Sequence, residues 1–218
     1  MAKLDGAFNP KIFLSTSGPG RQRVPFCKGE TVFAQGDKGD ALFVILKGRV
    51  LLSARCREKK EAVLDLLSDE DFVGKDCIAG ERLRTVSAIA MTDCTLLRIE
   101  KKTMIRALAG EVSLSNVLCA YVLKRNMQYQ QDLVDNRCNP SERRLARILL
   151  SLANFDRKTT DDAVIPNVSH ETLSKMVGTT RSRVCHFMKR FKESGFIDYE
   201  RSSEPIRIHR SLIAFQAR

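Results

Sequence analysis

Residues Ser169–Tyr199 constrain this chain more than any other stretch, because they specify two short helices separated by a tight turn. Ser169 is a favourable N-cap, and Gly178 stands just past the first helix, where a left-handed backbone is needed. Thr180 can cap the second helix. Apolar residues recur at i, i+3 and i+4 in the first helix, at Leu173, Met176 and Val177. The pattern predicts two capped helices joined at Gly178, followed by the start of a β-ribbon.

The second of these helices has two faces of different chemistry. Its apolar residues fall at i, i+3, i+4 and i+7, on Val184, Phe187, Met188 and Phe191. The opposite face carries polar and basic side chains, namely Arg181, Ser182, Cys185, His186 and Lys189. A helix that lies in a DNA major groove needs this combination of a buried stripe and a basic, hydrogen-bonding stripe. An ordinary surface helix is the alternative, but the preceding capped helix and turn favour DNA binding.

The positive charge of the chain is unevenly distributed. The formal net charge is +11, and the segment from Arg137 onward holds 16 Lys+Arg against 9 Asp+Glu, a net of +7. The first 136 residues hold the remaining 21 and 17, a net of +4. Because Lys and Arg neutralise phosphates and release counterions, a basic C-terminal third supports a polyanionic partner.

Several other classes of protein are disfavoured. No apolar run is long enough to span a bilayer and no secretory signal is visible, so we expect a cytoplasmic protein without a membrane partner. The cysteines form no C-x-x-C pair, and each is expected to be a small buried thiol; they lie at 27, 56, 77, 94, 119, 138 and 185. The N-terminal half contains no His for a metal site, and no nucleophile or phosphate-loop motif is present, so an enzyme is not expected. An RNA reader would need more exposed aromatic residues.

The N-terminal half has the pattern of a β-domain. Short strands alternate with turn clusters rich in Gly and Asp, and the predicted strands are Thr31–Phe33, Ala41–Lys47, Gly48–Ala54, Ala62–Leu67, Ser87–Ala90 and Thr95–Glu100. Such spacing is typical of a sandwich or a double-sheet jelly roll.

The run FCKGETVFAQGDKGDALFVILKGRVLLS resembles the first part of a cyclic-nucleotide-binding β-roll. Together with the C-terminal helix pair, the chain from Phe26 to His209 resembles the cyclic-AMP receptor / fumarate–nitrate regulator (Crp-Fnr) family of bacterial transcription factors. The resemblance implies an α+β chain with a β-roll sensor domain at 1–110, a dimerisation helix at 111–136 and a winged helix-turn-helix DNA-binding domain at 137–218. It also implies a homodimer that binds double-stranded DNA and contacts RNA polymerase.

A long helix is predicted between the two halves, over Ser113–Asn136. Its apolar side consists of Leu114, Val117, Leu118, Tyr121, Val122 and Leu133. In the family this helix pairs with its symmetry mate, whereas packing only on its own β-domain is the alternative. Asn136–Pro140 is interpreted as a hinge, and Ser141 as the cap of the next helix.

The resemblance assigns DNA contacts to individual residues. Arg181, Ser182 and His186 are expected to contact base edges. Thr179, Thr180 and Lys189 are expected to contact phosphates. Arg183 is either a phosphate contact or a solvated charge. Many family members have Glu in place of Ser182 and Arg in place of His186, so the familiar half-site sequence is not assumed. The wing is predicted at Phe196–Tyr199 and Pro205–His209 around Glu200–Glu204, where Arg201 could reach the DNA backbone or a plain surface hairpin could form.

The family's phosphate-binding cassette corresponds to Phe72–Ser87. Gly74 matches its opening glycine, and Arg84 and Thr85 match the pair that holds the cyclic phosphate. Lys75 replaces the usual acidic residue that accepts the ribose hydroxyl, and the loop is about one residue shorter. Further effector contacts are predicted on the long helix, at Arg125, Tyr129 and Gln130. The alternative, that these are ordinary surface residues of the helix, is equally well supported.

Three hypotheses for the sensor domain follow. The first is a cyclic nucleotide or another small anion held by Arg84 and Thr85. The second is a different ligand or none, with the β-roll serving dimerisation and docking. The third is a thiol switch at Cys185, in which oxidation blocks DNA binding.

Overall fold

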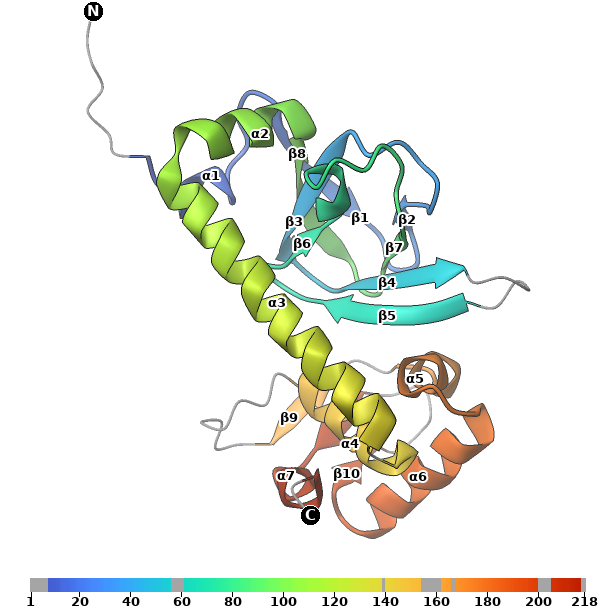
Figure 1. Ribbon diagram of the computed structural model, residues 1–218. Helices are drawn as coiled ribbons and strands as arrows, with labels where there is room; N and C mark the ends of the chain where they lie inside the picture. The colour runs from blue at the N-terminus through green and yellow to red at the C-terminus, as the bar shows by residue number, and fades with distance from the viewer. Residues whose placement is uncertain are drawn as a thin grey trace, which may run out of the picture. The chain divides into compact units, whose positions relative to one another are not determined.

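The computed structural model describes residues 8–55, 61–138, 140–153, 162–165, 168–199 and 205–216. The chain divides into two compact units, Met1–Met127 and Gln128–Arg218, and the division falls inside the long helix α3 (Val112–Cys138). Figure 1 shows the β-strands of the first unit and the short helices of the second.

The first unit is built from two four-stranded antiparallel sheets. One sheet has the order β1 (Arg21–Phe26), β8 (Cys94–Glu100), β3 (Ala41–Lys47) and β6 (Phe72–Val73). The other has the order β2 (Thr31–Phe33), β7 (Ser87–Ala90), β4 (Val50–Arg55) and β5 (Glu61–Leu67). Short helices complete the unit, at α1 (Pro10–Phe13), the 3₁₀ turn η2 (Lys75–Cys77) and α2 (Lys101–Gly110). This is the expected β-roll.

Strand β3 explains how the roll is held together. Alternate side chains of a strand point to opposite faces, and here both faces are buried. Phe43 and Ile45 belong to the core between the sheets, whereas Leu42 and Val44 belong to a second core with Met104 of α2 and Leu114 of α3. The continuous apolar run ALFVILK therefore reflects burial on two sides.

The second unit consists of short helices and a small sheet. Its helices are α4 (Ser141–Leu152), α5 (His170–Val177), α6 (Arg181–Glu193) and α7 (Ser211–Gln216). Its strands are β10 (Ile197–Asp198), β11 (Ile206–Ile208) and β9 (Ala163–Ile165), paired antiparallel in that order. Helix α6 packs on α4 and α5, and its large buried residue Phe191 contacts the rings of Phe196 and Phe215. The predicted helix pair and the two ribbon strands are confirmed.

Most strand predictions agree with the structure to within two residues, but β1, β6 and β9 were not predicted. Strand β1 contains Pro25, which is tolerated because β1 is at the edge of its sheet. Two predictions before α4 were wrong. The N-cap of α4 is Pro140, and Ser141 is already the first helical residue. The expected hinge begins too early, because α3 continues through Asn136 to Cys138; Asn139 lies outside the described residues.

The prediction that every cysteine is buried was also wrong. Cys77 and Cys94 are buried, but Cys27, Cys119 and Cys185 are exposed. Cys27 lies in the turn after β1, and the other two lie on outward-facing sides of α3 and α6. Cys56 lies outside the described residues.

Within the described ranges, no single helix is long and apolar enough to cross a membrane; only α2 and 112–131 of α3, taken as one pair bent by 111°, satisfy those criteria together.

Candidate DNA-binding helix and effector cassette

The turn between α5 and α6 has the geometry that the sequence predicts. The Ser169 hydroxyl accepts a hydrogen bond from the Thr172 amide at 3.0 Å and so caps α5. Gly178 ends α5 with a φ of 69°, which a residue with a side chain rarely adopts. The Thr180 hydroxyl then accepts a hydrogen bond from the Arg183 amide at 3.3 Å and caps α6. These contacts fix the start of α6 relative to α5.

Helix α6 separates its buried and exposed residues as expected. The buried face consists of Val184, Phe187, Met188 and Phe191. The residues predicted to contact bases, Arg181, Ser182 and His186, are all exposed, as are Thr180, Arg183 and Lys189, while Thr179 is half-buried. The predicted contacts Arg181, Ser182, Arg183, His186 and Lys189 thus lie exposed on α6, and Thr179 and Thr180 lie directly before it.

The cations of α6 differ in whether they have an acidic partner. Arg190 forms an ion pair with Glu142 of α4 at 3.2 Å, and Lys192 lies 4.0 Å from Asp198 of β10. Lys189 is 3.8 Å from Glu193 on the exposed side of the same helix. Among the residues that the structure describes, neither Arg181 nor Arg183 forms an ion pair. The unpaired charges are therefore at the N-terminal end of α6.

His170 is a neighbour of Arg181 that the sequence pattern did not single out. It is the first residue of α5, and partial burial together with the positive charge of Arg181 lowers its pKa. The imidazole is therefore neutral at pH 7. It adds a half-buried polar side chain beside the basic end of α6 without adding charge.

The ribbon after α6 is short but well paired. Ile197 pairs with Ile208 and Asp198 with Arg207, so the predicted wing strands are antiparallel neighbours. Arg207 is exposed on β11. Arg201 and the rest of the predicted tip, Glu200–Glu204, lie outside the described residues.

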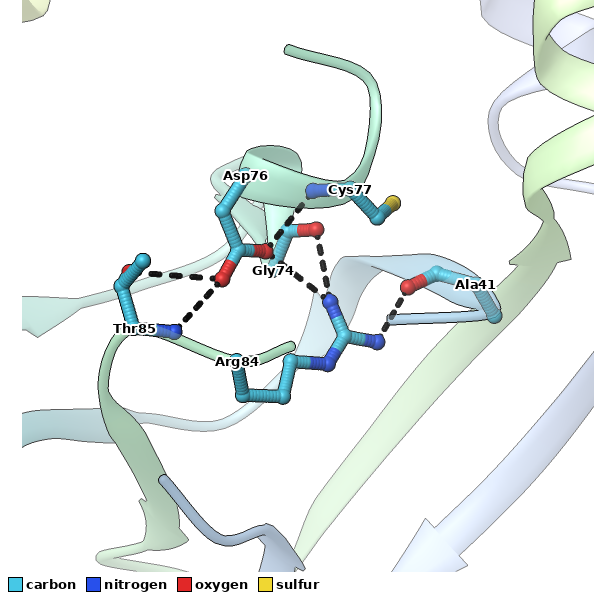
Figure 2. Close-up of polar contacts among 6 residues, drawn as sticks. All are labelled: Ala41, Gly74, Asp76, Cys77, Arg84 and Thr85. Atoms are coloured by element: carbon cyan, nitrogen blue, oxygen red, sulfur yellow. Dashed lines mark hydrogen bonds and ion pairs between the residues drawn. The ribbon is translucent and has the colours of Figure 1, made fainter. Parts of the chain in front are cut away.

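In the β-roll, Gly74, Arg84 and Thr85 lie together, as the cassette predicts (Figure 2). The Arg84 side chain is only 2% exposed. Its guanidinium donates to the carbonyl oxygens of Gly74, at 2.9 Å, and of Ala41, and lies 4.2 Å from the ring centre of Phe33. Gly74 is needed here, because a Cβ atom would lie 2.6 Å from Arg84 Nη1 and the φ is 72°.

Asp76 completes the cassette and was missed in the sequence pattern. Figure 2 shows its carboxylate between Arg84 and Thr85. Oδ1 accepts from Arg84 Nη1 at 3.0 Å and from the Cys77 amide at 3.0 Å. Oδ2 accepts from the Thr85 amide at 3.1 Å and the Thr85 hydroxyl at 3.3 Å. The only signal in the sequence was an acidic residue two positions after Gly74.

The remaining predicted effector residues have other partners or surroundings. Arg125 forms a part-buried ion pair with Asp65 of β5. Gln130 is exposed on α3 and Tyr129 is half-buried. Burial lowers the pKa of the Lys75 ammonium, and Asp71 and Asp76 oppose that shift. The described residues contain no cluster of His, Cys, Asp and Glu that could hold a metal ion.

Two protein-family models match the chain. The one described as Cyclic nucleotide-binding domain matches residues 23–111, and the one described as Crp-like helix-turn-helix domain matches residues 143–211. The chain is 28% identical over 186 residues to the CRP-like cAMP-activated global transcriptional regulator of Mycobacterium tuberculosis, covering 84% of this chain and 82% of that protein. It is 27% identical over 176 residues to the Global nitrogen regulator of Synechococcus elongatus, covering 79% of each.

Solved structures share the fold at lower identity. FixK2 from Bradyrhizobium japonicum superposes with a TM-score of 0.75 at 13% identity, covering 89% of this chain and 96% of that one. The c-di-GMP responsive global regulator CLP of Xanthomonas campestris superposes with a TM-score of 0.71 at 19% identity, covering 91% and 97%. At these identities the likeness concerns the fold.

Proposed function

Because the chain belongs to the Crp-Fnr family of transcription regulators, we propose that it binds a twofold-symmetric operator as a homodimer and reads each half-site with α6. The family consists of DNA-binding regulators rather than enzymes, and this chain has both of its domains in order: a cyclic-nucleotide-binding-type β-roll and a helix-turn-helix.

The observation that carries the proposed reading mechanism is the unpaired charge at the start of α6. Arg181 and Arg183 are exposed and form no ion pair among the described residues, whereas Arg190 is paired with α4. An exposed arginine without an ion-pair partner can pair with O6 and N7 of a guanine without breaking an ion pair. We therefore assign the main base contact to Arg181.

The other exposed residues of α6 have complementary roles. Ser182 and His186 carry hydrogen-bonding groups to base edges, and Lys189 contacts phosphate after leaving the weak exposed pair with Glu193. The Thr180 hydroxyl accepts one bond as a cap and keeps its proton to donate to a phosphate oxygen. Thr179 is a second phosphate contact, and Arg183 adds charge to the same backbone.

An exposed apolar stripe on α3 supports the homodimer. Leu123 is 58% exposed and Met127 is 69% exposed, and exposed Cys119 lies one turn before Leu123. The same helix buries Leu114 against its own β-roll. One side of α3 therefore packs on the β-roll, whereas the side with Leu123 and Met127 is exposed. Cys119, Leu123 and Met127 follow one another at spacings of four residues, so they lie on one side of α3 that the same helix of a second copy would cover. We also propose that the protein contacts RNA polymerase, because membership of this family implies that partner.

In-vitro selection of bound DNA sequences tests the reading mechanism. The wild type should select a site whose half-sites lie about 34 Å apart. Arg181→Ala should lower affinity for that site by roughly 5- to 150-fold, the equivalent of about 1–3 kcal/mol, and leave weak, salt-sensitive binding to all sequences.

Arg183→Ala is the matched control, because it removes an unpaired arginine two residues away on the same turn. It should weaken binding similarly for all sequences and leave the selected site unchanged. Sequence preference that survives in Arg181→Ala would contradict the assignment of Arg181.

A further inference from the structure

The anion site of the cassette is filled by the chain's own carboxylate. We propose that Asp76 substitutes for the phosphate of a ligand and is the residue that makes the wild-type β-roll exclude cyclic nucleotides. This inference rests on the β-roll assigned above and is independent of the DNA contacts assigned to α6.

The donors that would hold a cyclic phosphate are already bound to Asp76. In the family pattern, a cyclic phosphate is held by the guanidinium at Arg84 and the hydroxyl at Thr85. Here both groups, and the Thr85 amide as well, already donate to the oxygens of Asp76 at 3.0 to 3.3 Å (Figure 2). A phosphate oxygen needs these same donors, so phosphate and carboxylate cannot both be bound.

Asp76 also balances the buried charge of Arg84. A guanidinium that is 2% exposed requires a counter-charge, because an unpaired ion is strongly disfavoured inside a protein. Among the described residues, Asp76 is its only ion-pair partner, and Gly74 and Ala41 satisfy other N–H groups with carbonyl oxygens. A phosphate would have to displace Asp76, leaving that carboxylate without its counter-charge.

Asp76 is held in place by the local backbone. It lies in the middle of the 3₁₀ turn η2, and its Oδ1 also accepts from the adjacent Cys77 amide. The Asp76 carbonyl accepts from the Glu81 amide at 3.2 Å, and this bond closes the shortened loop. The Asp76 backbone is therefore held by the turn, and moving the carboxylate away would break its bond to the Cys77 amide.

The ribose side of the cassette agrees with this inference. Lys75 occupies the position where the family has a carboxylate that accepts a ribose hydroxyl, and an ammonium group only donates. Its surroundings include the carboxylates of Asp71 and Asp76. Asp71 in turn accepts from the Tyr121 hydroxyl at 3.1 Å. Arg84 Nε is buried without a hydrogen-bond partner, but the other donors assigned to a cyclic phosphate are bound to Asp76, and Lys75 gives the ribose hydroxyl no acceptor.

Thermal unfolding of the full chain with added anions tests the proposal. We compare wild type and Asp76→Ala with cyclic AMP, cyclic GMP and inorganic phosphate, at constant ionic strength set with chloride. The melting temperature of the wild type should not change with any of them. Asp76→Ala should melt several degrees lower, because Arg84 loses its counter-charge, and should recover part of that loss with phosphate or nucleotide but not with chloride.

Two further variants serve as controls. Asp40→Ala removes an exposed carboxylate, 68% exposed and paired with Arg98 at 2.7 Å, and should show no recovery with anions. Asp76→Asn keeps the shape of the side chain, removes its charge and replaces one acceptor oxygen by an NH2 donor, so it serves if Asp76→Ala does not fold. It should gain binding of inorganic phosphate by calorimetry that the wild type lacks.

The proposal is overturned if wild-type protein binds cyclic AMP with a micromolar Kd in equilibrium dialysis. It is equally overturned if neither Asp76 variant gains anion binding, because the cassette would then not be an anion site. Failure of the α6 assignment would appear separately, as unchanged sequence preference of Arg181→Ala in a selection that contains no nucleotide ligand.

Discussion

Arg84 in the β-roll and Arg181 at the start of α6 carry the same guanidinium in opposite surroundings. Arg84 is buried, paired with Asp76 and bonded to two backbone carbonyls, whereas Arg181 is exposed and, within the described residues, has no ion-pair partner. Arg84 therefore stabilises the fold of the first unit, whereas Arg181 of the second unit is available to an external partner. Under the proposal above, Arg84 is not available to a ligand phosphate because the protein itself supplies the anion, at Asp76.

The largest expected effect is the loss of stability when the buried Arg84 is removed. Arg84→Ala leaves the Asp76 carboxylate part-buried without its counter-charge, so the free energy of unfolding should fall by about 3–5 kcal/mol. Denaturant unfolding followed by circular dichroism measures this, since the chain has no tryptophan for fluorescence.

The control is Arg98→Ala, which removes an arginine from an exposed pair with Asp40. Its cost should be about 0–1 kcal/mol, because exposed pairs contribute little. Equal losses in the two variants would show that Arg84 is not the buried anchor of the roll.

The next largest effect is on dimer formation, and it concerns Leu123, an exposed residue that we assign to the contact with the second copy. Leu123→Glu places a charge in the apolar stripe of α3 and should raise the dimer dissociation constant by about 100-fold or more, because the charge would be desolvated in the seam. Analytical ultracentrifugation measures the change.

Leu64→Glu is the matched control, since Leu64 of β5 is 52% exposed against 58% for Leu123. It should leave the dimer intact. Dissociation in both variants, or in neither, would place the dimer contact elsewhere than on this face of α3.

A smaller effect is expected at the cap of α6. Thr180→Ala removes the hydroxyl that accepts from the Arg183 amide, so the free energy of unfolding should fall by about 1 kcal/mol. DNA affinity should fall for all sequences alike, because the Thr180 hydroxyl is assigned to a phosphate oxygen rather than to a base edge. Thr180→Ser keeps the oxygen and should retain most of the stability; if it behaves like Thr180→Ala, the threonine methyl rather than the cap is responsible.

The sequence predicts those parts of the fold whose cause is local. Strand β3 is a continuous apolar run between turns, and the start of α6 follows from Gly178 and Thr180, so both were predicted within a residue. Strand β1 was missed because Pro25 weakens its pattern and only its edge position makes the proline acceptable.

In the effector cassette, too, some residues could be predicted from the sequence and one could not. Arg84 and Thr85 were placed in the cassette, with Gly74, by the resemblance to the family, and the structure brings all three together. The role of Asp76 could not be predicted, because its bonds to Arg84 and Thr85 join residues eight and nine positions apart across a 3₁₀ turn. A sequence pattern records that an acidic residue is present but not which donors its carboxylate meets.

The smallest effect tests whether the charge of Arg181 is uncompensated, as the comparison with Arg84 requires. Burial first and the Arg181 charge second lower the pKa of His170 below its ordinary value of about 6.5. The folded chain therefore binds this proton less readily than the unfolded chain, so stability falls as the pH falls below about 6.5. An NMR titration of the imidazole protons, with His170→Asn to identify the signal, should show His170 titrating below that value. In Arg181→Ala the pKa of His170 should rise only part of the way back, because burial remains. No change in that variant would mean that the Arg181 charge is neutralised in solution, and the contrast between the two arginines would no longer hold.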